Sequence, residues 1–238
     1  MTRRLLLVGA IVLTVLVAVS GGAYVLMNSR TYQLGGRLVH RVATERALVA
    51  LTIDDGPTDR TPAILETLAA HHIPATFYLV GRDLAAHRDY GAAIAAAGHE
   101  IGNHSYTHRR LVFVTPATVR AEIERTDAEI ARTGYRGPVT VRPPYGKKLL
   151  ALPRYLSQHD RTTVMWDVES DSTGGAGTDT IVAETVTRTR PGSIILLHAM
   201  YQPNALDAIG RIATELRSRG YDFVTVSQLV TAENPSGP

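Results

Sequence analysis

Short apolar runs alternate with helix-like stretches along most of this chain, and that alternation limits the possible folds more than any other feature. The runs are rich in Val, Ile, Leu or Thr and too short for independent helices, so we interpret them as strands: Ala47–Ile53, Ala75–Val80, His99–Asn103, Val139–Arg142, Thr163–Trp166, Ser193–Leu197 and Asp222–Val226. Strands that alternate with helices pair in parallel through right-handed crossovers. Seven such units fit an α/β barrel of the TIM type, complete or incomplete, and a doubly wound open sheet is the alternative.

Helix signals lie between these strands. Thr61-Pro62 and Thr115-Pro116 each pair an N-cap residue with a proline at the first helical position, and glycines follow several of the helical stretches. The predicted helices are Ala63–His71, Arg82–Ala97, a helix from Pro116 to just before Gly134, Asp179–Thr189 and Leu206–Arg219.

The first segment of the chain is long and apolar enough to cross a bilayer. Leu5–Met27 is almost wholly apolar, and Arg3 and Arg4 precede it, so the positive-inside rule leaves the N-terminus in the cytoplasm and the rest outside. A cleaved signal peptide is the alternative, with small residues at Ala18-Val19-Ser20 for the peptidase. The apolar stretch continues beyond that point, which favours a single-pass anchor over a secreted protein. Both interpretations export the domain.

We therefore divide the chain into an anchor or signal segment (1–28), a polar linker (29–46), a catalytic domain (47–232) and a disordered tail (233–238). The formal charge is +3, and without the three arginines flanking the apolar segment the 25 basic residues fall to 22, which equals the number of acidic residues. With no dense basic run, we expect no nucleic-acid partner. The chain has no cysteine, which excludes disulfides and thiolate metal sites.

Polar clusters follow five of the strand candidates. In a parallel barrel the C-terminal strand ends share one face, where active sites are built. Five clusters on that face are a more specific signal than any one of them alone. They are Asp54-Asp55-Gly56-Pro57, His104 to His108, Arg142-Pro143-Pro144-Tyr145-Gly146, Asp167-Val168-Glu169 and His198.

One carboxylate and two imidazoles can hold a divalent ion, and a second carboxylate is then free to act as a base. Asp54 and Asp55 supply the carboxylates, and His104 and His108 lie on one face if helical. Each motif has an ordinary alternative: Asp-Gly-Pro is common in turns, and the histidines could lie on a solvated turn. Two adjacent carboxylates at a buried strand end, however, need a cation or hydrogen bonds to compensate them.

Arg142 and His198 also have two interpretations each. Arg142 could be a surface charge, but beside a rigid Pro-Pro segment we interpret it as the guanidinium partner of a carboxylate. His198 could be a core histidine, yet its place at the presumed catalytic face favours a general acid. The remaining histidines are interpreted as surface or structural residues, and Trp166 and most tyrosines as core or rim residues.

In order along the chain, these motifs resemble those of the NodB-like polysaccharide deacetylases (carbohydrate esterase family four). The motifs are Asp54-Asp55-Gly56-Pro57, His104-Ser105-Tyr106-Thr107-His108, Arg142-Pro143-Pro144-Tyr145-Gly146 and Leu196-Leu197-His198. The resemblance implies a distorted (β/α) barrel of seven or eight strands. It also implies a divalent metal, usually Zn²⁺ with Co²⁺, Ni²⁺ or Mn²⁺ as alternatives, and deacetylation of N- or O-acetylated sugars.

The resemblance also implies residue roles. Asp55, His104 and His108 resemble the metal ligands, Asp54 the general base and Arg142 the group that orients it. Tyr145 resembles the residue whose backbone N–H stabilises the oxyanion, His198 the general acid, and Leu196 part of the pocket for the acetyl methyl group. The fourth motif departs from the family, because Glu169 takes the best-aligned position and the usual Trp is missing. We expect Glu169 to partner His198 and the methyl pocket to be more open.

We therefore expect a monomeric, membrane-tethered hydrolase that removes N-acetyl groups from an extracytoplasmic glycan, with peptidoglycan N-acetylglucosamine or chitin-like oligomers as substrate. The alternatives are an O-acetyl esterase, a small-amide hydrolase, or a non-catalytic wall-binding pseudoenzyme. The filled ligand and acid–base positions argue against the last. A glycosidase that uses Asp54 and Asp55 as its acid–base pair does not fit, because adjacent residues on a strand point apart and do not face each other across a glycosidic bond.

Overall fold

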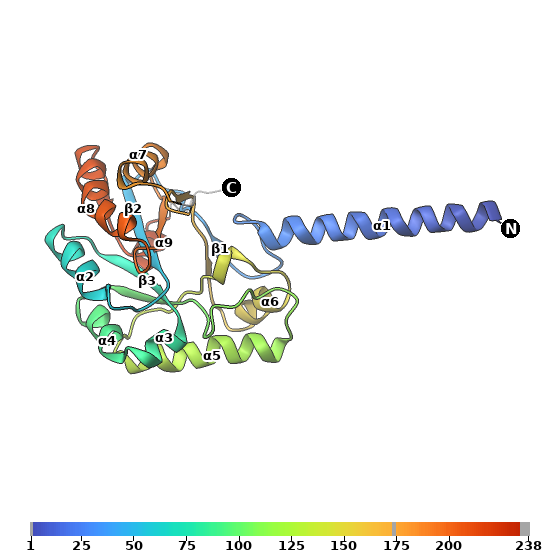
Figure 1. Cartoon of the computed structure of the whole chain (residues 1–238), viewed down its shortest axis with the longest axis horizontal. Coiled ribbons are helices and arrows are strands. Elements are labelled where there is room, and N and C mark those ends of the chain that lie inside the picture. Colours follow the sequence, from blue (N-terminus) through green and yellow to red (C-terminus); the bar gives the residue numbers. More distant parts are fainter. Residues whose placement is uncertain (1, 173–174, 234–238) are drawn as a thin grey trace.

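Parallel strands form the centre of the domain, helices pack around them, and one long helix projects away from it (Figure 1). The computed structural model describes residues 2–172 and 175–233. The strands are β1 (Leu38–Val39), β2 (Leu48–Asp54), β3 (Ala75–Leu79), β4 (Glu100–Asn103), β5 (Thr163–Val164), β6 (Val168–Glu169), β7 (Ile194–Leu197) and β8 (Asp222–Phe223). The helices are α1 (Thr2–Asn28), α2 (Thr61–Ala70), α3 (Gly81–Ala86), α4 (Arg88–Ala96), α5 (Pro116–Arg132), α6 (Ala151–Gln158), α7 (Thr178–Arg188), α8 (Pro203–Ser218) and α9 (Val226–Thr231), with a 3₁₀ turn η1 (Pro144–Gly146).

The main sheet is wholly parallel and confirms the α/β class. Its order is β4-β3-β2-β7-β6, and β8 pairs with the start of β2. β1 and β5 form a second parallel ladder, and single bridges from Val141 to Asn103 and Thr163 connect it to β4. Within residues 2–172 and 175–233 no ladder joins β5 to β6, so these pairings form a series rather than a closed ring.

Most predicted elements overlap an observed one. Val139–Arg142 is the exception among the strands, because it contributes only the bridging residue Val141. The predicted helix Arg82–Ala97 is two helices, α3 and α4, because His87 leaves the helical region (φ −127°, ψ 58°). The sequence prediction missed the two-residue strands β1 and β6 and the helices α6 and α9.

Alternate residues of β2 face two separate apolar layers, as the period of a strand requires. Val49, Leu51 and Ile53 pack outward into the layer that α2, α7 and α8 cover. Leu48 and Ala50 face the inner layer, which includes residues of β7 and α9. Farther along the inner face the side chains become polar, so the strand ends in a buried polar region.

The segment 29–46, for which the sequence predicted a linker, packs against the domain. Val39 and Val42 are buried, and the Val42 N–H donates to the Gly192 carbonyl over 2.9 Å. The α1 helix has an exposed stretch, Leu6–Asn28, that is apolar and long enough to span a membrane, as a signal sequence also can be. Of the predicted disordered tail, residues 234–238 lie outside the described residues.

Candidate metal and acid–base site

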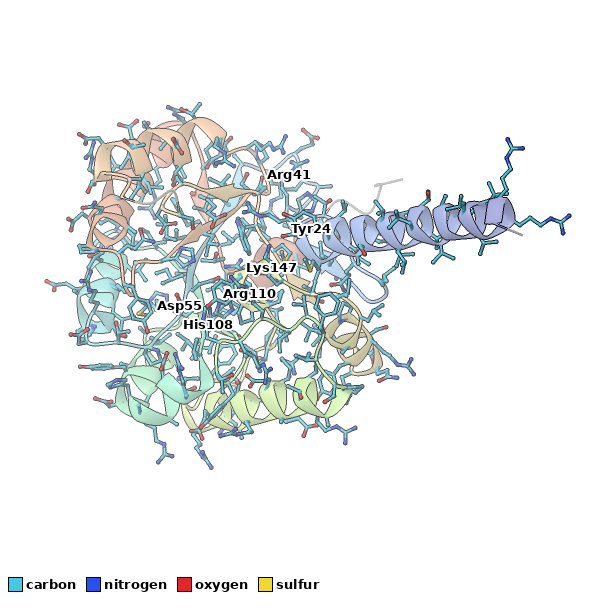
Figure 2. All side chains as sticks on the ribbon, turned by 45° about the vertical axis from the view of Figure 1, so that its right-hand side comes forward. Tyr24, Arg41, Asp55, His108, Arg110 and Lys147 are labelled. Atoms are coloured by element: carbon cyan, nitrogen blue, oxygen red, sulfur yellow. The ribbon has the colours of Figure 1, made fainter. Side chains whose placement is uncertain are left out.

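Three predicted ligands meet at the C-terminal ends of β2 and β4. Asp55 follows β2 in a left-handed conformation (φ 75°), and His104 follows β4 directly. Asp55 Oδ1 lies 3.2 Å from His108 Nε2 and 3.9 Å from His104 Nε2. One ligand atom from each of the three residues lies within 4.8 Å of the other two. Figure 2 shows Asp55 and His108 side by side on the domain. The convergence predicted from the sequence is therefore observed.

The protonation states of these residues suit a divalent cation. Burial lowers the pKa of His104 and of His108, so both favour the neutral form that binds metals. His104 Nδ1 lies 2.8 Å from the Arg142 carbonyl, which can only accept, so Nδ1 carries the proton and Nε2 is free for an ion. Burial raises the pKa of Asp55, and the charge of Asp54 adds to this. A cation would relieve that penalty.

Asp54 is held by a buried guanidinium. Arg142 is fully buried, and its Nη1 donates to Asp54 Oδ1 over 2.6 Å and to the Thr52 hydroxyl over 2.8 Å. The other nitrogens of Arg142 donate to the carbonyls of Val164 and Met165. Asp54 Oδ2 lies 3.7 Å from His104 Nε2, on the side of the three ligands. One oxygen of Asp54 is therefore fixed by Arg142 while the other faces the site.

His198 is paired with Asp171, so the prediction that Glu169 is its partner is wrong. Asp171 Oδ1 lies 3.2 Å from His198 Nδ1, and Asp171 Oδ2 accepts from the His198 backbone N–H over 2.5 Å. The strand register explains this choice. Glu169 lies opposite Leu196 in the parallel β6–β7 pair, so Asp171, two residues further along, is level with His198.

The partners of His198 keep it protonated. Burial disfavours the imidazolium, but the hydrogen bond to Asp171 and the charges of Asp54, Asp171 and Asp55 outweigh burial and raise its pKa to about 9. A protonated histidine is the form that a general acid needs at neutral pH.

Tyr145 lies at the rim of the site. It has a left-handed backbone (φ 58°) within η1, and its side chain is exposed. Its ring centroid is 4.8 Å from that of His108, and the Arg110 guanidinium lies 4.7 Å from the Tyr145 ring centroid. The predicted role of the Tyr145 backbone N–H stays a prediction.

A cavity of about 330 Å³ brings these residues together. Every predicted site residue except Arg142, which is buried beneath, lines it, and so do Arg30, Trp166 and Ser172. The sequence predicted a more open methyl pocket, because the fourth motif lacks its usual Trp. Trp166, from outside that motif, nevertheless forms part of the cavity wall. Its indole N–H donates to Glu169 Oε2 over 2.7 Å, which gives Glu169 a different partner from the one predicted.

Sequence reasoning missed four contributors to the site, Trp166, Asp171, Ser172 and Arg30. Trp166 was interpreted as core or rim, although its place at the end of a strand candidate beside Asp167 could have indicated the site. Asp171 lies two residues beyond the predicted Glu169, and only the β6–β7 register distinguishes them. Arg30 had no local signal, because its contacts are with residues more than 130 positions away.

Comparisons with known proteins identify relatives of this chain. Residues 41–164 match the family model described as polysaccharide deacetylase. A peptidoglycan-N-acetylglucosamine deacetylase of Bacillus cereus is 34% identical over 188 residues, which cover 77% of this chain and 68% of that protein. The peptidoglycan-N-acetylglucosamine deacetylase PgdA of Listeria monocytogenes is 30% identical, and the match covers 76% of this chain but only 38% of that longer relative.

The fold has solved counterparts as well. The crystal structure of the Bc1960 peptidoglycan N-acetylglucosamine deacetylase in complex with a hydroxamate-type benzamide matches with a TM-score of 0.77 and 32% identity. The match covers 83% of this chain and 95% of that chain. Sequence and fold therefore point to the same group of proteins.

Proposed function

The chain belongs to the polysaccharide deacetylase family, that is, the NodB-like carbohydrate esterase family four, and from this premise we propose that it is a metal-dependent N-deacetylase of an extracytoplasmic glycan. N-acetylglucosamine residues of peptidoglycan are the first substrate, and chitin-like oligomers the second. One observation carries the proposal: Asp55, His104 and His108 converge in a cavity that Asp54 and His198 also line.

Asp55, His104 and His108 would hold the metal, with Zn²⁺ first and Co²⁺, Ni²⁺ or Mn²⁺ as alternatives. Two neutral imidazoles and one carboxylate leave coordination positions open, as catalytic zinc sites do. When bound, a divalent ion there polarises an acyl carbonyl and lowers the pKa of bound water.

The side chains beside that site divide the proton transfers. Asp54, with Oδ1 fixed by Arg142, accepts the proton of the attacking water at Oδ2. The backbone N–H of Tyr145 donates to the developing oxyanion. His198, protonated and oriented by Asp171, gives its proton to the departing nitrogen. Leu196 and Trp166 supply apolar surface for the acyl group.

The charge state of His198 meets the requirement of an amide substrate. An amine leaves only after its nitrogen is protonated, whereas an alcohol needs less help. Because Asp171 and the nearby carboxylates raise the pKa of His198 to about 9, the proton is present at neutral pH. The similarity to N-acetylglucosamine and chitooligosaccharide deacetylases supports the amide as first candidate, with an O-acetyl ester as second.

The substrate assignment is tested by acetate release from the purified full-length chain. We expect release from N-acetylglucosamine oligomers and from peptidoglycan to exceed release from O-acetylated xylan at equal acetyl concentration. Faster release from the xylan would support the esterase. No release from any of these glycans, by a chain that binds zinc, would contradict the deacetylase proposal.

Two substitutions separate the base from the ligands. We expect Asp54→Asn to retain the metal and lower kcat by about 10²- to 10⁴-fold, the range for lost general-base help. His104→Ala should lose metal and activity together. Metal content by mass spectrometry and acetate release are measured on the same preparations, and full activity in either variant would contradict the assigned role.

We also propose that the protein is a monomer anchored in the cell membrane by α1, with the 47–232 domain outside. Arg3 and Arg4 before the apolar helix support that orientation. Secretion after cleavage is the alternative. The inner apolar layer and the series of parallel strands support a distorted (β/α) barrel.

A further inference from the structure

Arg30 extends into the catalytic cavity from the segment that follows α1. It lies two residues after the end of α1 at Asn28, and it lines the same cavity as Asp55 and His108. Its Nη2 donates to Glu169 Oε2 over 2.7 Å, and its guanidinium carbon lies 4.6 Å from the centre of the Trp166 ring. A residue next to the apolar helix therefore forms part of the site wall.

The backbone around Arg30 is fixed to the domain. The Ser29 carbonyl accepts from Lys148 Nζ over 2.6 Å, and Lys148 is almost fully buried. Lys147 donates to the side chain of Asn28. Figure 2 shows Lys147 and Arg110 between Tyr24, near the end of α1, and the pair Asp55 and His108. Because these contacts hold residues 28 and 29, directly before Arg30, Arg30 enters the cavity from a defined position.

The guanidinium keeps donors available. An arginine has five N–H donors, and among the described residues Arg30 makes one side-chain hydrogen bond, to Glu169. Its side chain is 46% exposed, whereas that of Glu169 is 12% exposed. Glu169 itself is held by the Trp166 indole N–H and the Ser172 hydroxyl. Glu169 and Trp166 thus orient Arg30 in the cavity wall, and the other N–H groups of its guanidinium remain available as donors.

We propose that Arg30 is a substrate-binding residue that donates hydrogen bonds to an oxygen acceptor on the glycan, with Glu169 and Trp166 as its positioning residues. The proposal rests on the proposed function, because it places a sugar in this cavity. The acceptor is a sugar hydroxyl or a carboxylate on a neighbouring sugar, which present the same oxygen chemistry to a guanidinium. The bound glycan then lies next to the end of α1.

The test is the full-length chain in detergent with Arg30→Ala, assayed on two substrates: neutral N-acetylglucosamine oligomers and glycan in which alternate sugars carry a carboxylate. A charge-assisted hydrogen bond predicts a KM increase of about tenfold or more on at least one substrate, with kcat within about twofold and metal content unchanged. An increase on both substrates identifies a hydroxyl acceptor, and an increase confined to the second identifies the carboxylate.

Arg37→Ala is the matched control. Arg37 lies in the same segment and also pairs with a glutamate, Glu233, over 2.7 Å, but it does not line the cavity. Its KM should match that of the wild type. Glu169→Gln should raise KM less than Arg30→Ala, and the double variant should not exceed Arg30→Ala, because Glu169 acts through Arg30.

Equal KM values for wild type and Arg30→Ala on both substrates would overturn the proposal. A lower kcat in Arg30→Ala with an unchanged KM would overturn it as well. Calorimetric titration of the oligomer into Asp54→Asn, with and without Arg30→Ala, gives the same answer without turnover: a weaker Kd supports the role and an unchanged Kd refutes it. A wild-type chain that releases no acetate would instead contradict the proposed function, so the two failures are distinguishable.

Discussion

At the scale of single residues, the proton on His198 depends on Asp171. Burial alone would lower the pKa of His198, and the hydrogen bond and charge of Asp171 are among the contributions that raise it to about 9. A general acid acts in its protonated form, so its contribution to kcat is present below its pKa and is lost as the pH rises through that pKa.

Asp171→Asn should therefore move the alkaline limb of the kcat profile to lower pH and reduce kcat at neutral pH. The substitution removes a charge that favours the imidazolium while burial remains. The measurement is kcat against pH for both chains loaded with the same metal. Glu169→Gln is the control, because Glu169 contacts Trp166 and Arg30 rather than His198, and its alkaline limb should stay in place. A limb that moves with Glu169→Gln and not with Asp171→Asn would contradict the pairing.

Arg142 and Asp54 form a buried ion pair whose loss should be costly. Arg142→Met leaves the Asp54 carboxylate buried without its partner, and breaking such a pair costs about 3 to 5 kcal/mol of unfolding free energy. Arg161→Met is the comparison, because Arg161 pairs with Asp127 in a partly exposed position, where a pair contributes about 1 kcal/mol or less. Urea unfolding of the three chains measures the difference, and equal losses would contradict this account.

At the scale of elements, the convergence of the site residues could be predicted because these residues lie at the ends of strands. Asp54, Asp55, His104 and His198 each follow a short apolar run, and parallel strands end at one face, so their meeting followed from the strand pattern. The partner of His198 did not follow, because a choice between Glu169 and Asp171 needs the β6–β7 register. A two-residue strand carries too little periodicity to reveal its register.

The segment 29–46 shows a second limit of structure prediction from the sequence. Its polar composition and Gly35-Gly36 predicted a linker, yet β1 pairs with β5 and Val42 packs against the turn before β7. These contacts join residues far apart in sequence, so no local pattern indicates them. The same holds for Arg30 and Glu169.

Gly192→Ala tests this packing. Gly192 has a φ of +80°, and a Cβ there would lie 1.9 Å from the Val42 carbonyl oxygen, which is backbone and cannot rotate away. We expect a loss of about 3 kcal/mol in unfolding free energy from the clash and the backbone strain together. Gly35→Ala has a similar φ of +85° with nothing within 4 Å, so it isolates the strain. Equal losses in the two variants, measured by urea unfolding, would contradict the packing of Val42 against the domain.

At the scale of the whole molecule, the proposed membrane anchor depends on α1. Its exposed apolar surface has no protein partner among the described residues, and Figure 1 shows it leaving the domain as a single rod. We expect the full-length chain to stay in the membrane fraction after alkaline carbonate washing, with its N-terminus at residue 1 or 2. A soluble product that begins after Ser20 would establish cleavage instead, and N-terminal sequencing distinguishes the two.

The central claim is that one divalent ion, held by Asp55, His104 and His108, is required to deacetylate the glycan. The most direct test strips the full-length chain with a chelator and titrates zinc back while acetate release from N-acetylglucosamine oligomers is followed. We predict no release from the stripped chain, and a rise that saturates at one zinc per chain. In His108→Ala, the rise should need far more zinc or be absent. Full acetate release by the metal-free chain, or equal zinc titrations for wild type and His108→Ala, would contradict the account.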